Sequence, residues 1–283
     1  MMPHVARKVS EARKYLEGKR SSDSRVGLVP TMGFLHEGHL SLVRRARREN
    51  DTCVVSIFVN PLQFGPTEDL EAYPRDMDRD LDLLSSEGVD LVFAPDFDEM
   101  YSPDRSVTVT ERDISRSLCG SARPGHFDGV CTVVLKLFNI LSPDRAYFGE
   151  KDYQQLQVVR RMARDLDVDV EIRGCPIVRE KDGLAMSSRN IYLGEAERRD
   201  ALALSKALVE ARSAFEAGER DCRKILVTVR RVLEAHPLVN IDYAEIRGAE
   251  TLLPVERVEG RAVVALAARV GKARLIDNTF LEP

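Results

Sequence analysis

The sequence predicts an α/β fold in which helices cover both faces of a parallel sheet, followed by a smaller α+β domain. Through the first two-thirds of the chain, short continuous apolar runs alternate with segments of helical period. Such runs are typical of parallel strands, because both faces of these strands are buried. After residue 189 the order changes to two helical segments and then three strand-like runs. The length of 283 residues also exceeds that of a typical single domain.

The first domain is predicted from strands and helices that alternate along the chain. The strands, which are rich in β-branched and other apolar residues, cover residues 26–30, 53–59, 89–94, 146–148 and 168–172. The helical segments cover residues 40–50, 67–86, 130–141 and 153–166. This alternation predicts a Rossmann-like parallel sheet, in which ligands bind beyond the carboxyl ends of the strands.

The second domain is predicted to be a smaller α+β unit. Helical segments cover residues 195–217 and 221–235, and His236-Pro237 ends the second of them. Strand-like runs follow at residues 240–246, 261–267 and 273–277. We therefore predict a ligand-binding domain over residues 1–185 and a C-terminal lid domain over residues 186–283.

The composition excludes several classes of protein. The net charge is −4 and no basic stripe is present, so a nucleic-acid partner is not expected. The arginine run at residues 44–48 is interpreted as a solvated helix face. The five cysteines form no C-x-x-C pair, and Cys53 and Cys131 lie in apolar stretches typical of a core. No apolar run approaches the roughly 18 residues of a membrane span and no signal region is present, so we expect a cytoplasmic protein.

The segment His36-Glu37-Gly38-His39 follows a predicted strand and precedes a predicted helix. A loop in this position presents backbone N–H groups and the positive end of the helix, which together favour a phosphate. Metalloproteases need H-E-x-x-H, and the i+3 spacing here excludes that motif. The P-loop and G-x-G-x-x-G spacings are also absent. The alternative is one surface histidine and one core histidine.

Further polar clusters follow other predicted strands. Gly149-Glu150-Lys151-Asp152 follows residues 146–148, and Lys151 has the charge and reach for a phosphate, although a capped helix with a surface lysine is an alternative. The stretch Ala185 to Asn190 places small hydroxyl residues beside Arg189, which suits phosphate binding in a mobile loop. Gln63 and Gln155 are uncharged donors and acceptors suited to a hydroxyl-bearing substrate.

These stretches together resemble the pantothenate synthetase family. The motifs occur in family order and cover nearly the whole chain: P-T-M-G-x-L-H-x-G-H-L-S-L-V, F-V-N-P-x-Q-F, Y-P-R, R-P-G-H-F-x-G-V, F-G-E-K-D-Y-Q-Q and M-S-S-R-N. The family belongs to the class I synthetase-like nucleotidyltransferases, whose signatures resemble His36-x-x-His39 and Met186 to Arg189. Phe34 stands where many relatives carry a small residue. The C-terminal domain offers no diagnostic motif.

The resemblance implies that ATP, (R)-pantoate and β-alanine give pantothenate, AMP and pyrophosphate through a pantoyl adenylate. It implies His39 as proton donor, with His36, Lys151 and Arg189 as further catalytic residues, and Mg²⁺ as cofactor. It implies Gln63 and Gln155 as pantoate-binding residues, Gln63 also near β-alanine, and a homodimer. The implied ATP-binding residues are Met32, Gly33, Phe34, Leu35, His36, Glu37, Gly38, His39, Gly149, Glu150, Lys151, Asp152, Val178, Met186, Ser187, Ser188 and Arg189.

Two competing functions follow from the same residues. One is another adenylyl transferase or ligase on this fold, with a phosphopantetheine or nucleotide substrate. The other is a non-catalytic nucleotide sensor, which the full set of charged groups around the inferred phosphates disfavours. Metal ligands are not assigned, because surface charge on a helix explains Asp78, Asp80 and Asp82 equally well.

Overall fold

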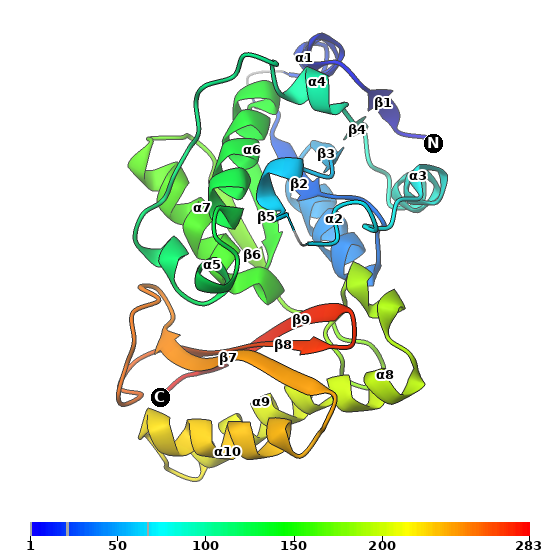
Figure 1. The fold of residues 1–283 in the computed structure, drawn as a ribbon. Helices are drawn as coiled ribbons and strands as arrows, with labels where there is room; N and C mark the ends of the chain where they lie inside the picture. The colour runs from blue at the N-terminus through cyan, green and yellow to red at the C-terminus, as the bar shows by residue number, and fades with distance from the viewer. Residues whose placement is uncertain (1, 21–22, 67) are drawn as a thin grey trace. The chain divides into compact units, whose positions relative to one another are not determined.

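The computed structural model describes residues 2–20, 23–66 and 68–283, and these form two compact units (Figure 1). Unit 1 comprises the chain up to Arg112, together with Arg123–Glu150 and Gln155–Pro176. Unit 2 comprises Asp113–Ala122, Lys151–Gln154 and Ile177–Pro283. The predicted division into a domain of residues 1–185 and a lid domain of residues 186–283 stays a prediction. No helix in the described ranges has both the length and the apolar character of a membrane span.

Unit 1 is built on a six-stranded parallel sheet with the strand order β1-β4-β3-β2-β5-β6. The strands are β1 (His4–Ala6), β2 (Val26–Thr31), β3 (Thr52–Ile57), β4 (Leu91–Phe93), β5 (Arg145–Gly149) and β6 (Glu171–Cys175). The predicted parallel sheet is therefore confirmed. The edge strand β1 and the helix α1 (Val9–Glu17) are additions that the sequence analysis does not predict.

Helices cover both faces of this sheet (Figure 1). Helices α2 (Glu37–Glu49) and α3 (Met77–Ser86) lie on one face and share a core with residues such as Val29, Val55 and Cys175. Helix α7 (Tyr153–Asp165) lies on the opposite face, where Leu156 packs against Gly174 of β6. The same face is covered by α1 and by α6 (His126–Leu141), an almost wholly buried helix. The shorter segments of unit 1 are η1 (Pro61–Gln63), α4 (Phe97–Met100) and η3 (Glu150–Asp152), which continues into unit 2.

Unit 2 contains a three-stranded antiparallel sheet with the order β7-β8-β9. Its strands are β7 (Val239–Gly248), β8 (Ala262–Val270) and β9 (Ala273–Leu281), and its helices are α8 (Glu195–Ala201), α9 (Ala203–Glu216) and α10 (Cys222–Glu234). Helices α9 and α10 pack on one face over a core that includes Ile225, Val229 and Leu266. The short elements η2 (Ile114–Arg116), α5 (Cys119–Ala122) and η4 (Ser188–Tyr192) complete the unit. The predicted α+β character is confirmed.

Several predicted element boundaries are wrong, among them the start of α6 and the ends of β8 and β9, and two of the errors have a clear local cause. Helix α3 begins at Met77 and not near residue 67, which itself lies outside the described residues, because Pro74 disfavours helix and Asp76 caps the start. Strand β6 begins three residues late because Val168 N–H still bonds to the end of α7. The helix predicted over 195–217 is interrupted at Leu202.

Candidate active site

Strands β2 and β5 are neighbours at the point where the strand order of unit 1 reverses. One side of the sheet continues through β3, β4 and β1, and the other continues through β6. Loops that leave adjacent strands at such a switch point diverge and open a crevice for a ligand. The loop before α2 leaves β2 here, and Gly149 ends β5 at the neighbouring position. The fold therefore places the loop before α2 and the start of the Gly149–Asp152 segment side by side, at the carboxyl ends of two central strands.

The loop from Met32 to His36 is held by a buried carboxylate of α3. Phe34 and Leu35 each donate a backbone N–H to Asp80, both at 2.7 Å, and Asp80 is only 1% exposed. Burial raises the pKa of Asp80, and the two backbone donors oppose that shift. Gly33 has φ +80°, where a Cβ would lie 3.0 Å from the same carboxylate. From the sequence, helix-surface charge remains one explanation for Asp80, and the burial of this carboxylate excludes it.

Phe34 adopts a left-handed conformation, with φ 51°, which is uncommon for a residue with a side chain. The guanidinium of Arg79 lies over its ring at 5.1 Å from the ring centroid. Because the N–H groups of Phe34 and Leu35 bond to Asp80, they are not donors for a phosphate. Donors remain at the start of α2, where the N–H groups of Glu37 and Gly38 have no intrahelical acceptor.

The two histidines at the start of α2 stand together. Their ring centroids are 4.0 Å apart with the planes tilted by 31°, so the spacing predicted from sequence does bring both rings to one side of the helix. The backbone N–H of His36 donates to Nδ1 of His39 at 3.3 Å. A neutral imidazole that accepts at Nδ1 carries its proton on Nε2. His39 therefore carries its N–H donor on Nε2.

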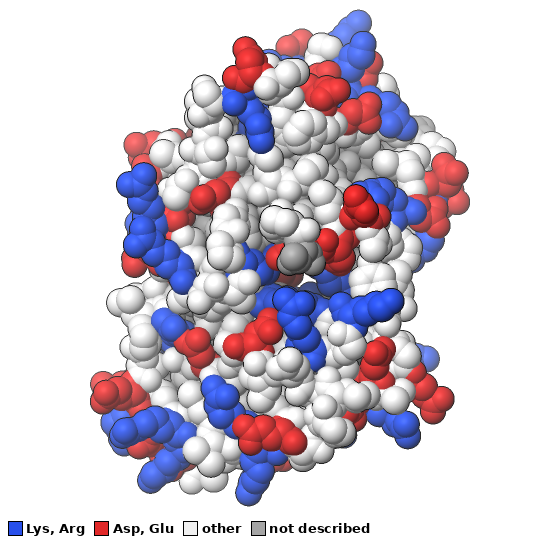
Figure 2. All heavy atoms as spheres, in the orientation of Figure 1, with Lys and Arg blue, Asp and Glu red and all other residues white. Residues whose placement is uncertain are grey.

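Three arginines of the run at residues 44–48 form ion pairs with acidic side chains. Arg44 forms ion pairs with Glu37 and with Glu87, the latter at 2.7 Å, and the hydrogen bond from Arg44 lowers the pKa of Glu37. Arg45 pairs with Glu49 at 2.9 Å, and Arg47 lies 3.5 Å from Asp90. Figure 2 shows the same mixture on the face in view, where acidic side chains stand among basic ones.

Gln63 lies in η1, directly after β3, and its side-chain amide has a fixed orientation. Asn60 Nδ2 donates to Gln63 Oε1 at 3.2 Å, and Tyr101 Oη donates to Asn60 Oδ1 at 3.0 Å. The amide nitrogen of Gln63 lies 3.1 Å from the sulfur of Met32, in the loop after β2. The NH₂ group of Gln63 is thus directed toward the loop that precedes the histidines.

The backbone of Gln63 is held just as firmly by the start of α6. Arg123 Nη2 donates to Gln63 O at 3.2 Å, and His126 Nδ1 lies 2.9 Å from the same oxygen. Gly129 has no room for a side chain, since a Cβ would lie 2.3 Å from Leu62 O. The motif R-P-G-H-F-x-G-V marks this stretch in the sequence, but the sequence alone gives no reason to connect the stretch with Gln63.

Two adjacent glutamines at the start of α7 have different surroundings. Gln154 is buried and makes three hydrogen bonds with Ile114 O, Ser117 O and the N–H of Cys119, at 2.7 to 2.9 Å. Within the described ranges, the half-buried Gln155 side chain has no hydrogen-bond partner. Gln154 is therefore a structural residue, and Gln155 has an amide available for a ligand.

Unit 2 contains the remaining predicted residues. Lys151 follows Glu150 in η3, and its ammonium lies 4.0 Å from the carboxylate of Asp152. Val178 O accepts the N–H of Met186 at 3.0 Å, which closes a hairpin before Ser187. Ser187 then accepts the N–H of Arg189 at 3.3 Å and caps η4. The structure thus joins Val178 directly to the Met186–Arg189 segment.

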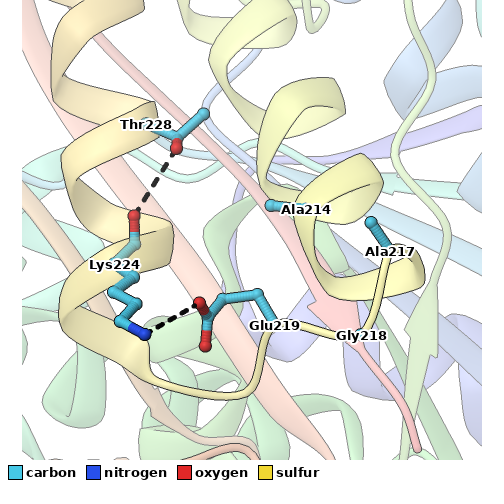
Figure 3. Close-up of a pocket in the computed structure, with 6 residues that line it drawn as sticks. All are labelled: Ala214, Ala217, Gly218, Glu219, Lys224 and Thr228. Atoms are coloured by element: carbon cyan, nitrogen blue, oxygen red, sulfur yellow. Dashed lines mark hydrogen bonds and ion pairs between the residues drawn. The ribbon is translucent and has the colours of Figure 1, made fainter.

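A surface hollow of about 470 Å³ lies elsewhere in unit 2, between the end of α9 and the start of α10 (Figure 3). Its walls include Ala214, Ala217 and Gly218. Figure 3 shows its lysine, Lys224, directed to Glu219, 3.6 Å away. None of the predicted site residues lines this hollow.

Comparison with known proteins identifies the family. The family described as Pantoate-beta-alanine ligase matches residues 4–280 of the chain. This chain belongs to the pantoate–β-alanine ligase family. A curated pantothenate synthetase from Thermotoga neapolitana is 60% identical over 273 residues, which cover 96% of this chain and 98% of that protein. The resemblance inferred from the sequence motifs is therefore confirmed.

Solved structures of the pantoate–β-alanine ligase family have the same fold. The crystal structure of pantothenate synthetase from Thermus thermophilus has a TM-score of 0.94 and 48% identity, covering 99% of this chain and all of that one. The pantoate–β-alanine ligase of Francisella tularensis has a TM-score of 0.81 and 31% identity, covering 98% of this chain and 97% of that one. That ligase is described as complexed with Beta-gamma ATP and Beta-alanine.

Proposed function

We propose that this chain uses ATP to join pantoate to β-alanine through a pantoyl adenylate. The observation that carries the proposal is the histidine pair, 4.0 Å between ring centroids, at the start of α2 in a member of the pantoate–β-alanine ligase family. A carboxylate oxygen of pantoate attacks the α-phosphorus, and the bond from that phosphorus to the β-phosphate oxygen breaks. Pyrophosphate leaves. The amine of β-alanine then attacks the acyl carbon, loses a proton, and displaces AMP.

The first step places growing negative charge on the α-phosphate and on the leaving pyrophosphate. Oriented donors and cations lower the barrier to such a step more than any other single factor. His39 supplies the Nε2–H donor, because the backbone N–H of His36 bonds to its Nδ1. His36, Lys151 and Arg189 supply further donors or charge. No nucleophilic side chain is required, because the carboxylate of the substrate attacks.

Two glutamines have proposed roles in binding the acid substrates, pantoate and β-alanine. Gln63 and Gln155 bind the hydroxyl groups of pantoate, and Gln63 also lies near β-alanine. The fixed amide of Gln63 supports this role, because an oriented donor is poorly satisfied by an analogue that lacks the hydroxyl. The ATP-binding residues are those expected from the sequence, with Phe34 and Leu35 contributing through side-chain packing and the loop shape.

Mg²⁺ is the proposed cofactor. In the described part of the chain, no group of three or more His, Cys, Asp or Glu side chains forms a metal cage. That fits an ion which enters with ATP, because Mg²⁺ in nucleotide enzymes takes most of its ligands from phosphates and water. Asp152, whose carboxylate is about half-exposed, is the candidate protein ligand. A homodimer and a cytoplasmic location complete the proposal.

The test is a reaction mixture of the purified protein with ATP, Mg²⁺, pantoate and β-alanine, assayed for AMP, with each component omitted in turn. We expect AMP only with the complete mixture, and a single turnover of pyrophosphate without β-alanine. Pyrophosphate release that requires a different acceptor would favour another adenylyl transferase. ATP binding without turnover would favour a nucleotide sensor.

A further inference from the structure

Strand β9 carries two adjacent polar residues that the proposed mechanism does not use, Asp277 and Asn278. They are 3% and 4% exposed. Successive residues of a strand point to opposite faces of the sheet. Asp277 shares the face of Leu275 and Leu281, which belong to the core under α9 and α10, and Asn278 lies on the other face. Buried polar groups cost free energy unless they are hydrogen-bonded, so their partners are informative.

Asp277 holds the hairpin that leads to the Met186–Arg189 segment. Its two carboxylate oxygens accept the two terminal nitrogens of Arg179, at 2.7 and 2.9 Å. Arg179 follows Val178 and also donates to Gly183 O at 3.1 Å, so one guanidinium contacts both β9 and the turn of the hairpin. Such a paired contact fixes both distance and direction.

Asn278 holds the backbone of the predicted catalytic lysine. Its side-chain nitrogen donates to Lys151 O at 3.0 Å. The neighbouring Tyr153 donates its hydroxyl to Ala249 O at 3.0 Å, and its ring packs edge-on against Phe280 at 5.0 Å between centroids. The short segment Lys151–Gln154 is thereby fixed to the C-terminal sheet.

We infer that Asp277 and Asn278 are positioning residues, which hold two ATP-binding segments of unit 2 on one rigid strand. The inference rests on the proposed function and adds to it. Lys151 and the Met186–Arg189 segment are separated by more than thirty residues in the chain, but both are tied to adjacent residues of β9. Asn278 contacts Lys151 directly, whereas Asp277 acts through Arg179, whose neighbour Val178 accepts the N–H of Met186. Their mutual placement is set by the backbone of that strand. A displacement of about 1 Å in a catalytic group can lower a rate by as much as 10²-fold.

The test is a double-mutant cycle on the full-length protein. Single-turnover pyrophosphate release from ATP and pantoate is measured for wild type, Asn278→Ala, Lys151→Ala and the double variant. We expect Asn278→Ala to slow release by about tenfold or more. The double variant should then be within threefold of Lys151→Ala alone, because Asn278 acts through that lysine. Thr279→Ala, on the same strand, is the control and should stay within twofold of wild type.

Asp277 is tested through its partner, which also covers the case in which Asn278→Ala does not fold. Arg179→Lys keeps the charge and removes the paired contact. It should raise KM for ATP more than KM for pantoate. An equal rise in both constants overturns the inference, as does full additivity in the Asn278 and Lys151 cycle or an Asn278→Ala rate within threefold of wild type. Absence of pyrophosphate release by the wild type would instead overturn the proposed function itself.

Discussion

At the scale of single residues, His39 is the side chain whose chemistry is best defined by its surroundings. The backbone N–H of His36 fixes Nδ1 of His39 as an acceptor, so Nε2 carries the proton of the neutral ring. Such a donor is the kind of group that stabilises charge at a phosphate. Because His39 lies at the start of α2, the positive end of the helix adds to the attraction for a phosphate at this point.

Replacing His39 by alanine removes that donor while leaving the loop anchored by Asp80. We expect His39→Ala to slow adenylation by about 10²–10³-fold, the scale of one oriented stabiliser. The measurement is the pre-steady-state rate of pyrophosphate release. A rate within threefold of wild type would refute the role.

The adjacent glutamines provide a matched pair at the same scale. Gln155→Ala should weaken pantoate binding more than ATP binding and leave unfolding unchanged, because its amide has no partner among the described residues. Gln154→Ala should instead lower the free energy of unfolding by about 1–3 kcal/mol, because it leaves buried groups unpaired. Titration of both ligands and urea unfolding separate the two effects, and the reverse order of binding losses for Gln155→Ala would contradict the assignment.

At the scale of elements, the approach of α6 to η1 determines where Gln63 lies. Gly129 permits that approach, because a Cβ there would lie 2.3 Å from Leu62 O. We expect Gly129→Ala to destabilise the protein by about 1–3 kcal/mol and to raise KM for pantoate, since the two backbones must separate. Gly260→Ala is the control, because a Cβ at Gly260 meets nothing within 4 Å. If Gly129→Ala is destabilised but its KM for pantoate is unchanged, the position of η1 does not depend on the position of α6.

Periodicity predicts the central elements well and the edges poorly. Strands β2, β3 and β5 are buried along most of their length, and the mostly apolar runs that this burial requires identify them in the sequence. Strand β1 is His4-Val5-Ala6, with only one of its three residues buried, so it lacks the continuous apolar run that marks the equally short β4. The predicted start of α3 lies too early, because acidic residues with helical spacing continue on both sides of Pro74 and periodicity alone does not detect a proline break.

At the scale of the whole molecule, the candidate site residues were predictable where they lie in contiguous motifs. Asp80 was not, because its partners Phe34 and Leu35 lie about 46 residues away in the chain and only the fold brings them together. The role of Asn278 was not predictable for the same reason, since its contact with Lys151 spans 127 residues. A motif identifies the groups that meet a ligand, whereas the groups that orient them are fixed by tertiary packing.

The central claim is that the carboxylate of pantoate attacks phosphorus and forms an adenylate. It is tested most directly with pantoate labelled with ¹⁸O in its carboxylate, followed by mass spectrometry of the products. The carboxylate oxygen that bonds to phosphorus stays with phosphorus when β-alanine attacks the acyl carbon. We predict one ¹⁸O atom in the phosphate of AMP and none in pyrophosphate. Formation of ADP with ¹⁸O in inorganic phosphate, or AMP without label, would contradict the account.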